Sequence, residues 1–153
     1  MALLATLRFD AAQRAFNSLY YARGGGYARD FSTYASSGTM PARAEADDFH
    51  GRLRERFGKR AGMEIRVAEI GCGNGNNARR FLERVRRLDA LRGTAFAPSV
   101  SYPLADFSRG MLADAKRSAL LSGHPGKILA EAANAERLEI GGGLMLARSN
   151  EVL

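Results

Sequence analysis

A glycine-rich loop joins two patterned stretches at residues 66–81, which read RVAEIGCGNGNNARRF. The residues before the loop alternate in polarity and include β-branched side chains, which is typical of a strand. The residues after it carry apolar side chains at helical spacing. Glycines at 71, 73 and 75 give the backbone conformations that side chains exclude, and they let a ligand approach closely. The stretch therefore predicts a strand, a tight loop and a helix in direct succession.

The alternation of strands and helices continues to the end of the sequence. We expect strands at residues 63–70, 98–106, 127–132 and 143–149, and helices at residues 76–91 and 109–121, with Ser108 as the cap of the second helix. Helical connections of this kind link parallel strands through crossovers. We therefore predict an α/β fold, a Rossmann-like parallel sheet with crossover helices, over residues 63–153. Pro103 cannot donate to a ladder, so we expect it at a strand end or in an edge strand.

Residues 1–62 form an N-terminal extension of helices and loops in this interpretation. A helix is expected near residues 10–22, and three consecutive glycines at residues 24–26 end it. A second helix is expected at residues 41–60, with Pro41 in its first turn. Phe49, Leu53 and Phe57 recur every four residues along this helix, so they should face a core.

The spacing of the glycines discriminates between ligand classes. A Walker loop needs a lysine on the phosphates, and the loop has none. The dinucleotide fingerprint G-x-G-x-x-G places its third glycine where Asn76 stands, since the third glycine comes one residue early at Gly75. The remaining pattern is E-x-G-x-G-x-G, beginning at Glu69. A tight turn without any ligand is the alternative that these residues leave open.

This pattern resembles the first motif of class I S-adenosylmethionine-dependent methyltransferases. The resemblance implies that Gly71, Cys72, Gly73 and Gly75 line the nucleoside and the methionine chain of S-adenosyl-L-methionine. The N–H groups of the following helix would bind the methionine carboxylate. Glu69 would face the cationic amino group of the cofactor, directly or through water.

Two later segments extend the resemblance. Residues 106–112, DFSRGML, match the family's D-x-S-x-x-M-L pattern, which implies that Asp106 accepts hydrogen bonds from both ribose hydroxyls. Phe107 could pack on the adenine, although it could equally belong to the core. Asn134 stands where the family has an aspartate that receives the adenine amino group, and an asparagine carbonyl can accept that bond. A simple Asp/Ser cap and an ordinary polar loop are the respective alternatives.

Two flanking segments are similar to the MidA-like methyltransferases, which include the mitochondrial complex I assembly arginine methyltransferase. The residues that carry this similarity are Tyr27, Asp30, Phe31 and Thr33 near the N-terminus, and Asn150 and Glu151 near the C-terminus. The resemblance implies a protein arginine as methyl acceptor, with Asn150 and Glu151 as tentative catalytic residues and Glu151 orienting the guanidinium. The family's next motif, DALP, would follow Leu153, where this sequence ends. Class I sheets have seven strands, so we expect the C-terminal strands to be missing and a partner or a second copy to cover the exposed edge.

Composition narrows the partners only weakly. The net charge of +7 comes from twenty arginines and three lysines scattered over every segment, which keeps RNA as a possible partner without indicating one. Two alternatives to a methyltransferase that acts on protein side chains therefore stay open: an RNA methyltransferase, and a catalytically inactive cofactor-fold module that binds a partner protein. A single cysteine excludes an internal disulfide, and no metal site is expected. His50 and His124 stand alone in polar contexts, which favours the surface.

The sequence also bears on location. No stretch is long and apolar enough to span a bilayer, so we expect no membrane partner. The first residues carry Arg8 and Arg14, as an organellar presequence would, but Asp10 and a shortage of serine argue against one. We predict a cytoplasmic protein, with a mitochondrial location as the alternative.

Overall fold

Four parallel strands form one sheet in the computed structural model, which describes residues 15–16, 19, 39–132 and 143–149. The strands are β1 Ile65–Ile70, β2 Val100–Asp106, β3 Ile128–Ala132 and β4 Leu144–Ser149. Their order across the sheet is β3-β2-β1-β4, and every neighbouring pair is parallel. This confirms the predicted α/β fold with a Rossmann-like parallel sheet, and each of the four strands lies where the sequence placed it.

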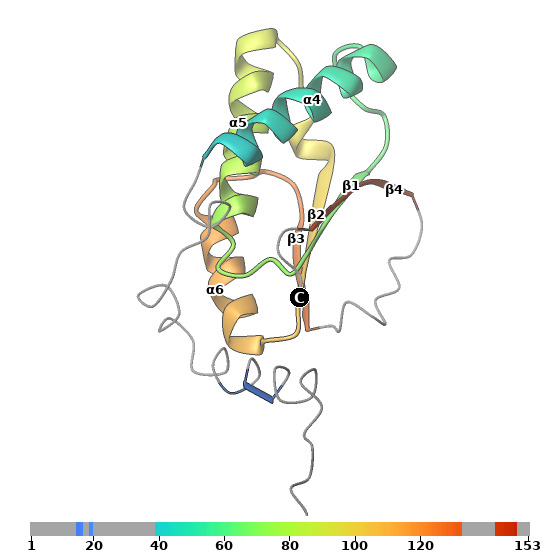
Figure 1. Ribbon diagram of the computed structural model, residues 1–153. Helices are drawn as coiled ribbons and strands as arrows, with labels where there is room; N and C mark the ends of the chain where they lie inside the picture. Colours follow the sequence, from blue (N-terminus) through green and yellow to red (C-terminus); the bar gives the residue numbers. More distant parts are fainter. Residues whose placement is uncertain (1–14, 17–18, 20–38, 133–142, 150–153) are drawn as a thin grey trace, which may run out of the picture.

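The helices lie together on one side of the sheet (Figure 1). They are α4 Met40–Phe57, α5 Asn76–Arg92 and α6 Arg109–Leu120, with a short 3-10 helix, η1 Ala97–Ser99, before β2. α5 packs between α4 and α6, and α6 also contacts β2 and β3. Of the helix expected at residues 10–22, only residues 15, 16 and 19 are described, and they are helical. No helix among the described residues is long and apolar enough to cross a bilayer.

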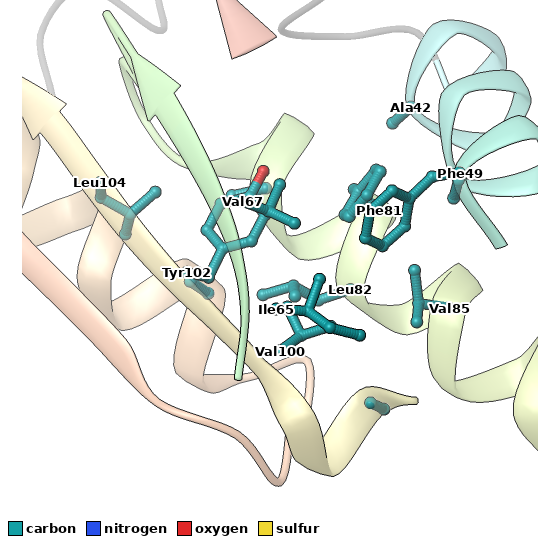
Figure 2. Close-up of a cluster of buried hydrophobic side chains, with 14 of the residues drawn as sticks. Ala42, Phe49, Ile65, Val67, Phe81, Leu82, Val85, Val100, Tyr102 and Leu104 are labelled. Carbon is teal, nitrogen blue, oxygen red and sulfur yellow. The ribbon is translucent and has the colours of Figure 1, made fainter. Parts of the chain in front are cut away.

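The core fills the space between these helices and the sheet. In Figure 2, Phe49 of α4 and Phe81 of α5 point toward each other, and Tyr102 of β2 lies beside them. The Phe81 ring centroid lies 5.5 Å from that of Phe49 and 5.8 Å from that of Tyr102. The stripe predicted on α4 is confirmed, since Phe49 and Leu53 are buried and Phe57 packs against the same core. α4 therefore shares one hydrophobic core with the sheet.

The expectation for Pro103 is wrong, because β2 lies between β1 and β3 and the proline is in its middle. The Tyr102 N–H donates toward β3, to the Lys127 carbonyl at 2.7 Å. Successive amides of a strand point to opposite neighbours, so the nitrogen of Pro103 faces β1. The β1–β2 register has pairs at Arg66–Ser101 and at Glu69–Leu104 but none between them. The interior strand thus tolerates proline because the ladder is interrupted at the position where the donor is missing.

The surface position expected for His50 is also wrong, since this side chain is completely buried. Its Nε2 lies 3.1 Å from Asp89 Oδ1 and 3.0 Å from the Thr94 hydroxyl. Asp89 Oδ2 in turn accepts from the backbone N–H groups of Phe96 and Ala97 at 2.9 and 2.7 Å. The pair therefore joins α4 to the connection between α5 and β2. His124 is half-buried, with Nε2 at 2.9 Å from the Val100 carbonyl.

Burial lowers the pKa of His50, although hydrogen bonding and attraction to Asp89 oppose this. A folded-state pKa below the unfolded value of about 6.5 means that the unfolded chain binds the extra proton more readily. The stability from neutral His50 is therefore present above about pH 6.5 and is lost as pH falls through the folded-state pKa. The wild-type protein should lose unfolding free energy as the pH falls from about 8 to about 5, by up to about 1.4 kcal/mol per pH unit from His50. We expect His50→Gln to lack this contribution, so its unfolding free energy should fall less over the same range. Urea denaturation across that range measures this, and parallel curves for the two proteins would refute it.

Candidate functional site

The glycine loop lies at the carboxyl end of β1, where β1 passes into α5. The strand order reverses beside β1, because the chain proceeds from β1 to β2 and β3 and then returns to β4 on the other side. In open α/β sheets, ligands bind outside the carboxyl ends of the strands at such a reversal. Gly71, Gly73 and Gly75 all have positive φ, at 67°, 53° and 73°. The loop thus adopts a backbone that favours glycine at all three predicted positions.

Backbone hydrogen bonds fix this loop to the end of β2. The N–H groups of Gly71 and Cys72 both donate to the Ala105 carbonyl, at 2.8 and 3.2 Å. The Gly75 N–H donates to the Cys72 carbonyl at 2.9 Å, which closes the turn. The two strand ends and the loop therefore form one hydrogen-bonded unit.

Gly73 and Gly75 face different surroundings. A Cβ on Gly75 would lie 2.5 Å from the Ala115 Cα, so this glycine lets α5 begin against the backbone of α6. A Cβ on Gly73 would meet only the Met111 Cε, at 3.5 Å. Gly75 thus allows close packing of two helices, as the last glycine of dinucleotide-binding loops allows close packing of a helix and a strand. Gly73 instead leaves space at the carboxyl ends of the strands.

Asp106 lies at the end of β2 and points at the glycine loop. Its Oδ2 accepts from the Gly73 N–H at 3.1 Å, and its Oδ1 accepts from the Ser108 N–H at 2.9 Å. Asp106 as a whole is 6% exposed. Burial raises the pKa of Asp106, and the backbone N–H donors, first Ser108 and then Gly73, oppose that rise. The structure therefore brings together the predicted loop and the predicted acid.

The residues after Asp106 start α6. Ser108 is the N-cap, and its hydroxyl accepts from the Met111 N–H at 3.3 Å, as the sequence predicted. Phe107, between the acid and the cap, is 51% exposed. A large apolar side chain is thus accessible next to the carboxylate at the carboxyl edge of the sheet.

Glu69 takes part in a buried network that its sequence pattern did not predict. Its Oε2 accepts from the Tyr102 hydroxyl at 2.5 Å and from Arg148 Nη1 at 2.9 Å. Arg148 also donates to Glu45 of α4 through Nε and Nη2, at 2.8 and 2.5 Å, and its guanidinium lies 4.3 Å from the Phe81 ring centroid. Burial raises the pKa of Glu69, while Arg148 and Tyr102 lower it. The carboxylate expected to face a cofactor ammonium therefore faces an arginine of β4.

A pattern in the sequence could have indicated this arginine. Glu69 has the same strand parity as Ile65 and Val67, which are fully buried, so it needs a partner inside the core. β4 pairs directly with β1, with Arg148 opposite Glu69. A buried cation on the neighbouring strand is the partner that burial of a carboxylate requires.

One acceptor near the loop has no partner. Asn77 lies in the first turn of α5, directly after the glycine loop. Its Oδ1 is buried and has no hydrogen-bond partner within the part of the chain that the structure describes. An acceptor of this kind, beside the glycine loop, is suited to a donor supplied by a ligand.

The remaining predicted residues divide into two groups. Cys72 is buried, and burial raises the pKa of its thiol well above the usual range, so it contributes backbone to the loop and no nucleophile. Asn134, Asn150 and Glu151 lie outside the described residues, so their roles remain predictions. Among the residues that are described, no group of histidine, cysteine or acidic side chains could hold a metal ion.

Comparisons with known proteins found similarity to solved structures. No protein-family model and no curated protein matches the chain. The chain is similar to the crystal structure of an uncharacterized ACR, COG1565 superfamily protein from Burkholderia thailandensis, at 24% sequence identity and a TM-score of 0.43. The similarity covers 88% of this chain and 36% of that protein. The chain therefore spans about a third of the length of the solved structure.

Proposed function

We propose that the glycine loop and Asp106 bind S-adenosyl-L-methionine, and that the chain is the cofactor-binding part of a methyltransferase. The observation that carries the proposal is the hydrogen bond from the Gly73 N–H to Asp106 Oδ2. It brings the two motifs of the family resemblance together at the reversal of strand order, although 33 residues separate them in sequence.

The described residues fit the parts of this cofactor. Each carboxylate oxygen of Asp106 accepts one backbone N–H and has a second lone pair, which suits the two ribose hydroxyls. Gly75 is the N-cap of α5 and has no side-chain oxygen, and the Asn76 N–H donates to Asn74 Oδ1, so the N–H groups that follow in the first turn would bind the methionine carboxylate. We assign the Oδ1 of Asn77 as the acceptor for the cofactor ammonium. Glu69 could accept from the ammonium only if its ion pair with Arg148 were broken.

The cofactor, when bound, supplies a methyl group on an already activated sulfur. The chain therefore has to bind, orient and exclude water, and positioning provides most of the rate. We propose a protein arginine as the acceptor, on the resemblance of residues 27–33 and 150–151 to the MidA-like methyltransferases. Glu151 would hold the guanidinium in that arrangement.

A specific observation supports a second candidate, a cofactor-fold module that binds a partner without turnover. Arg148 neutralises Glu69, the acid at the strand end nearest the loop, so this carboxylate is already paired within the chain and is not available to the cofactor ammonium. Incubation of the chain with labelled cofactor and a protein extract separates the two candidates. Label on protein arginine supports the enzyme, whereas cofactor binding without label in any acceptor supports the module.

Replacing Asp106 tests the assignment of the ribose contact. We expect Asp106→Ala to weaken binding of S-adenosylhomocysteine about 100-fold, because two hydrogen bonds to a charged acceptor are lost. Gly73→Val should weaken it similarly, since a branched side chain would project from the loop with strained backbone. Isothermal titration measures the affinity of both variants for S-adenosylhomocysteine. Asp48→Ala is the control, because it removes an exposed acid of α4 instead. Circular dichroism establishes that each variant is folded, and unchanged affinity in folded Asp106→Ala would exclude this role.

A further inference from the structure

Exposed cations gather at the end of the molecule opposite the glycine loop. Asp47 pairs with Arg84 and His50 with Asp89, so α4 and α5 point toward the same end of the molecule. In Figure 1, α4 crosses α5 obliquely, and both helices end in the upper part of the view. The exposed cations on and around these ends, which we call the basic pole, are Arg54, Arg56, Lys59, Arg60, Arg92 and Lys127.

The cations of the basic pole lack acidic partners among the described residues, as do Arg43, Arg109 and Lys116 elsewhere on the surface, and Arg92 donates to His50 Nδ1 at 3.3 Å. Along α4, α5 and α6, Arg52, Arg79, Arg84 and Arg117 each pair with an acid. None of the six cations of the basic pole forms an ion pair with any residue that the structure describes. The exposed acids in the neighbouring sequence are Glu55 and Glu64. The pole therefore carries an excess of positive charge open to a partner.

Helix dipoles explain part of this arrangement. Arg54 and Arg56 lie in the last turn of α4, and Arg92 in the last turn of α5, where positive charge is stabilising. Lys59, Arg60 and Lys127 lie beyond the helices, so this effect does not account for them. Two hydrogen bonds connect the loops of the pole. The Ala95 N–H donates to the Lys59 carbonyl at 2.8 Å, and the Ser99 hydroxyl donates to the Ala61 carbonyl at 3.4 Å.

Apolar side chains and a cavity lie among these charges. Met63 is 53% exposed and Leu91 is 68% exposed. Met63, Pro98 and Lys127 help to line an open cavity of about 480 Å³, formed by residues 61–64, 98–101 and 127. Ser101 also lines the cavity, and its hydroxyl is buried without a hydrogen-bond partner among the described residues. Methionine and arginine together are typical of the surfaces that bind proteins.

We propose that the basic pole is a docking surface for an acidic protein segment that carries apolar side chains. The carboxylates of such a segment would pair with the arginines, and an apolar side chain would enter the cavity beside Met63. A nucleic acid is disfavoured, because bases stack on exposed aromatic rings. Of the rings described in this part of the chain, Phe96 is buried, and Phe57 is half-buried with the Arg56 guanidinium carbon 5.3 Å from its centroid. The pole lies at the amino ends of the strands, so a docked segment would leave the glycine loop accessible.

The test compares three probes by fluorescence anisotropy at about 0.15 M salt, where long-range attraction is screened. The probes are a labelled helical peptide of about 20 residues rich in Glu and Leu, the same peptide with Ser for Leu, and a single-stranded RNA of equal charge. We expect the Glu/Leu peptide to bind at least about tenfold more tightly than either other probe. Tighter binding of the RNA would overturn the proposal in favour of a nucleic-acid surface.

Charge-reversal variants locate the binding. Arg54→Glu, Lys59→Glu and Arg60→Glu combined should weaken peptide binding at least about tenfold, and Met63→Ser about fivefold. The matched control reverses three exposed cations away from the pole, Arg43→Glu, Arg109→Glu and Lys116→Glu. Circular dichroism confirms that each variant is folded. Equal loss in the two triple variants would mean that net charge alone attracts the peptide, and would overturn the proposal. Neither triple variant needs to change the affinity for S-adenosylhomocysteine. The outcome of the peptide-binding test is therefore independent of the proposed methyltransferase function.

Discussion

Gly75→Ala is expected to destabilise the fold by about 2–5 kcal/mol, a large share of the roughly 5–15 kcal/mol that stabilises an ordinary domain. Two costs add at this position. The left-handed backbone at φ 73° costs a residue with a Cβ about 1–2 kcal/mol. The new Cβ would also lie 2.5 Å from the Cα and 2.6 Å from the carbonyl oxygen of Ala115. Those atoms belong to the backbone of α6, so α5 and α6 would have to separate. Urea denaturation followed by circular dichroism measures the loss.

Gly93→Ala is the matched control for this variant. Gly93 also has positive φ, at 64°, but a Cβ there would meet nothing within 4 Å. We expect a loss of only about 1 kcal/mol, from backbone strain alone. Equal losses in Gly75→Ala and Gly93→Ala would mean that α5 and α6 are not in backbone contact at the glycine loop, which contradicts the packing described above.

Arg148→Met is the second substitution with a large expected effect. Methionine keeps much of the packing over Phe81 but leaves the Glu69 carboxylate, 3% exposed, without a cation. Removing one partner of a buried ion pair costs about 3–5 kcal/mol, because the other charge stays buried. Burial already raises the pKa of Glu69, and loss of Arg148 removes the attraction that opposes this. The variant should therefore be more unstable at about pH 8 than at about pH 5, where Glu69 can take up a proton.

The double variant Arg148→Met with Glu69→Gln separates charge from packing. Since the neutral amide needs no cation, we expect the double variant to recover about half or more of the loss. The measurement is the free energy of unfolding for the wild type, both single variants and the double variant. Strictly additive losses would show that Arg148 and Glu69 do not interact, against the 2.9 Å contact between them.

Local patterns predicted the elements of this fold because the features that specify them are local. Alternation placed β1, and helical spacing placed the buried face of α5, including Phe81 and Val85. A serine before an apolar helix predicted the cap of α6. Pro103 and His50 were assigned wrongly for one reason. Their positions depend on neighbours that are remote in sequence, since a ladder interruption tolerates the proline and Asp89, 39 residues away, pairs with the histidine.

The candidate site also combines contacts that local sequence patterns predict with contacts that they do not. The contact between the glycine loop and Asp106 could be predicted, because both follow strands whose carboxyl ends meet at one edge of a parallel sheet. The network of Glu69, Tyr102, Arg148 and Glu45 could not, because it joins three strands and α4 across more than one hundred residues. Motif spacing gives the backbone of a site, whereas the partners of a buried charge depend on the assembled sheet.

The central claim is that the loop after β1 and the acid after β2 hold an adenosyl sulfonium compound. Isothermal titration of the folded chain with S-adenosylmethionine, S-adenosylhomocysteine, NAD and ATP tests it most directly. We predict saturable binding of the first two at one site, with NAD and ATP at least about tenfold weaker. Tighter binding of NAD or ATP, or no heat from S-adenosylmethionine with a chain that circular dichroism shows to be folded, would contradict it.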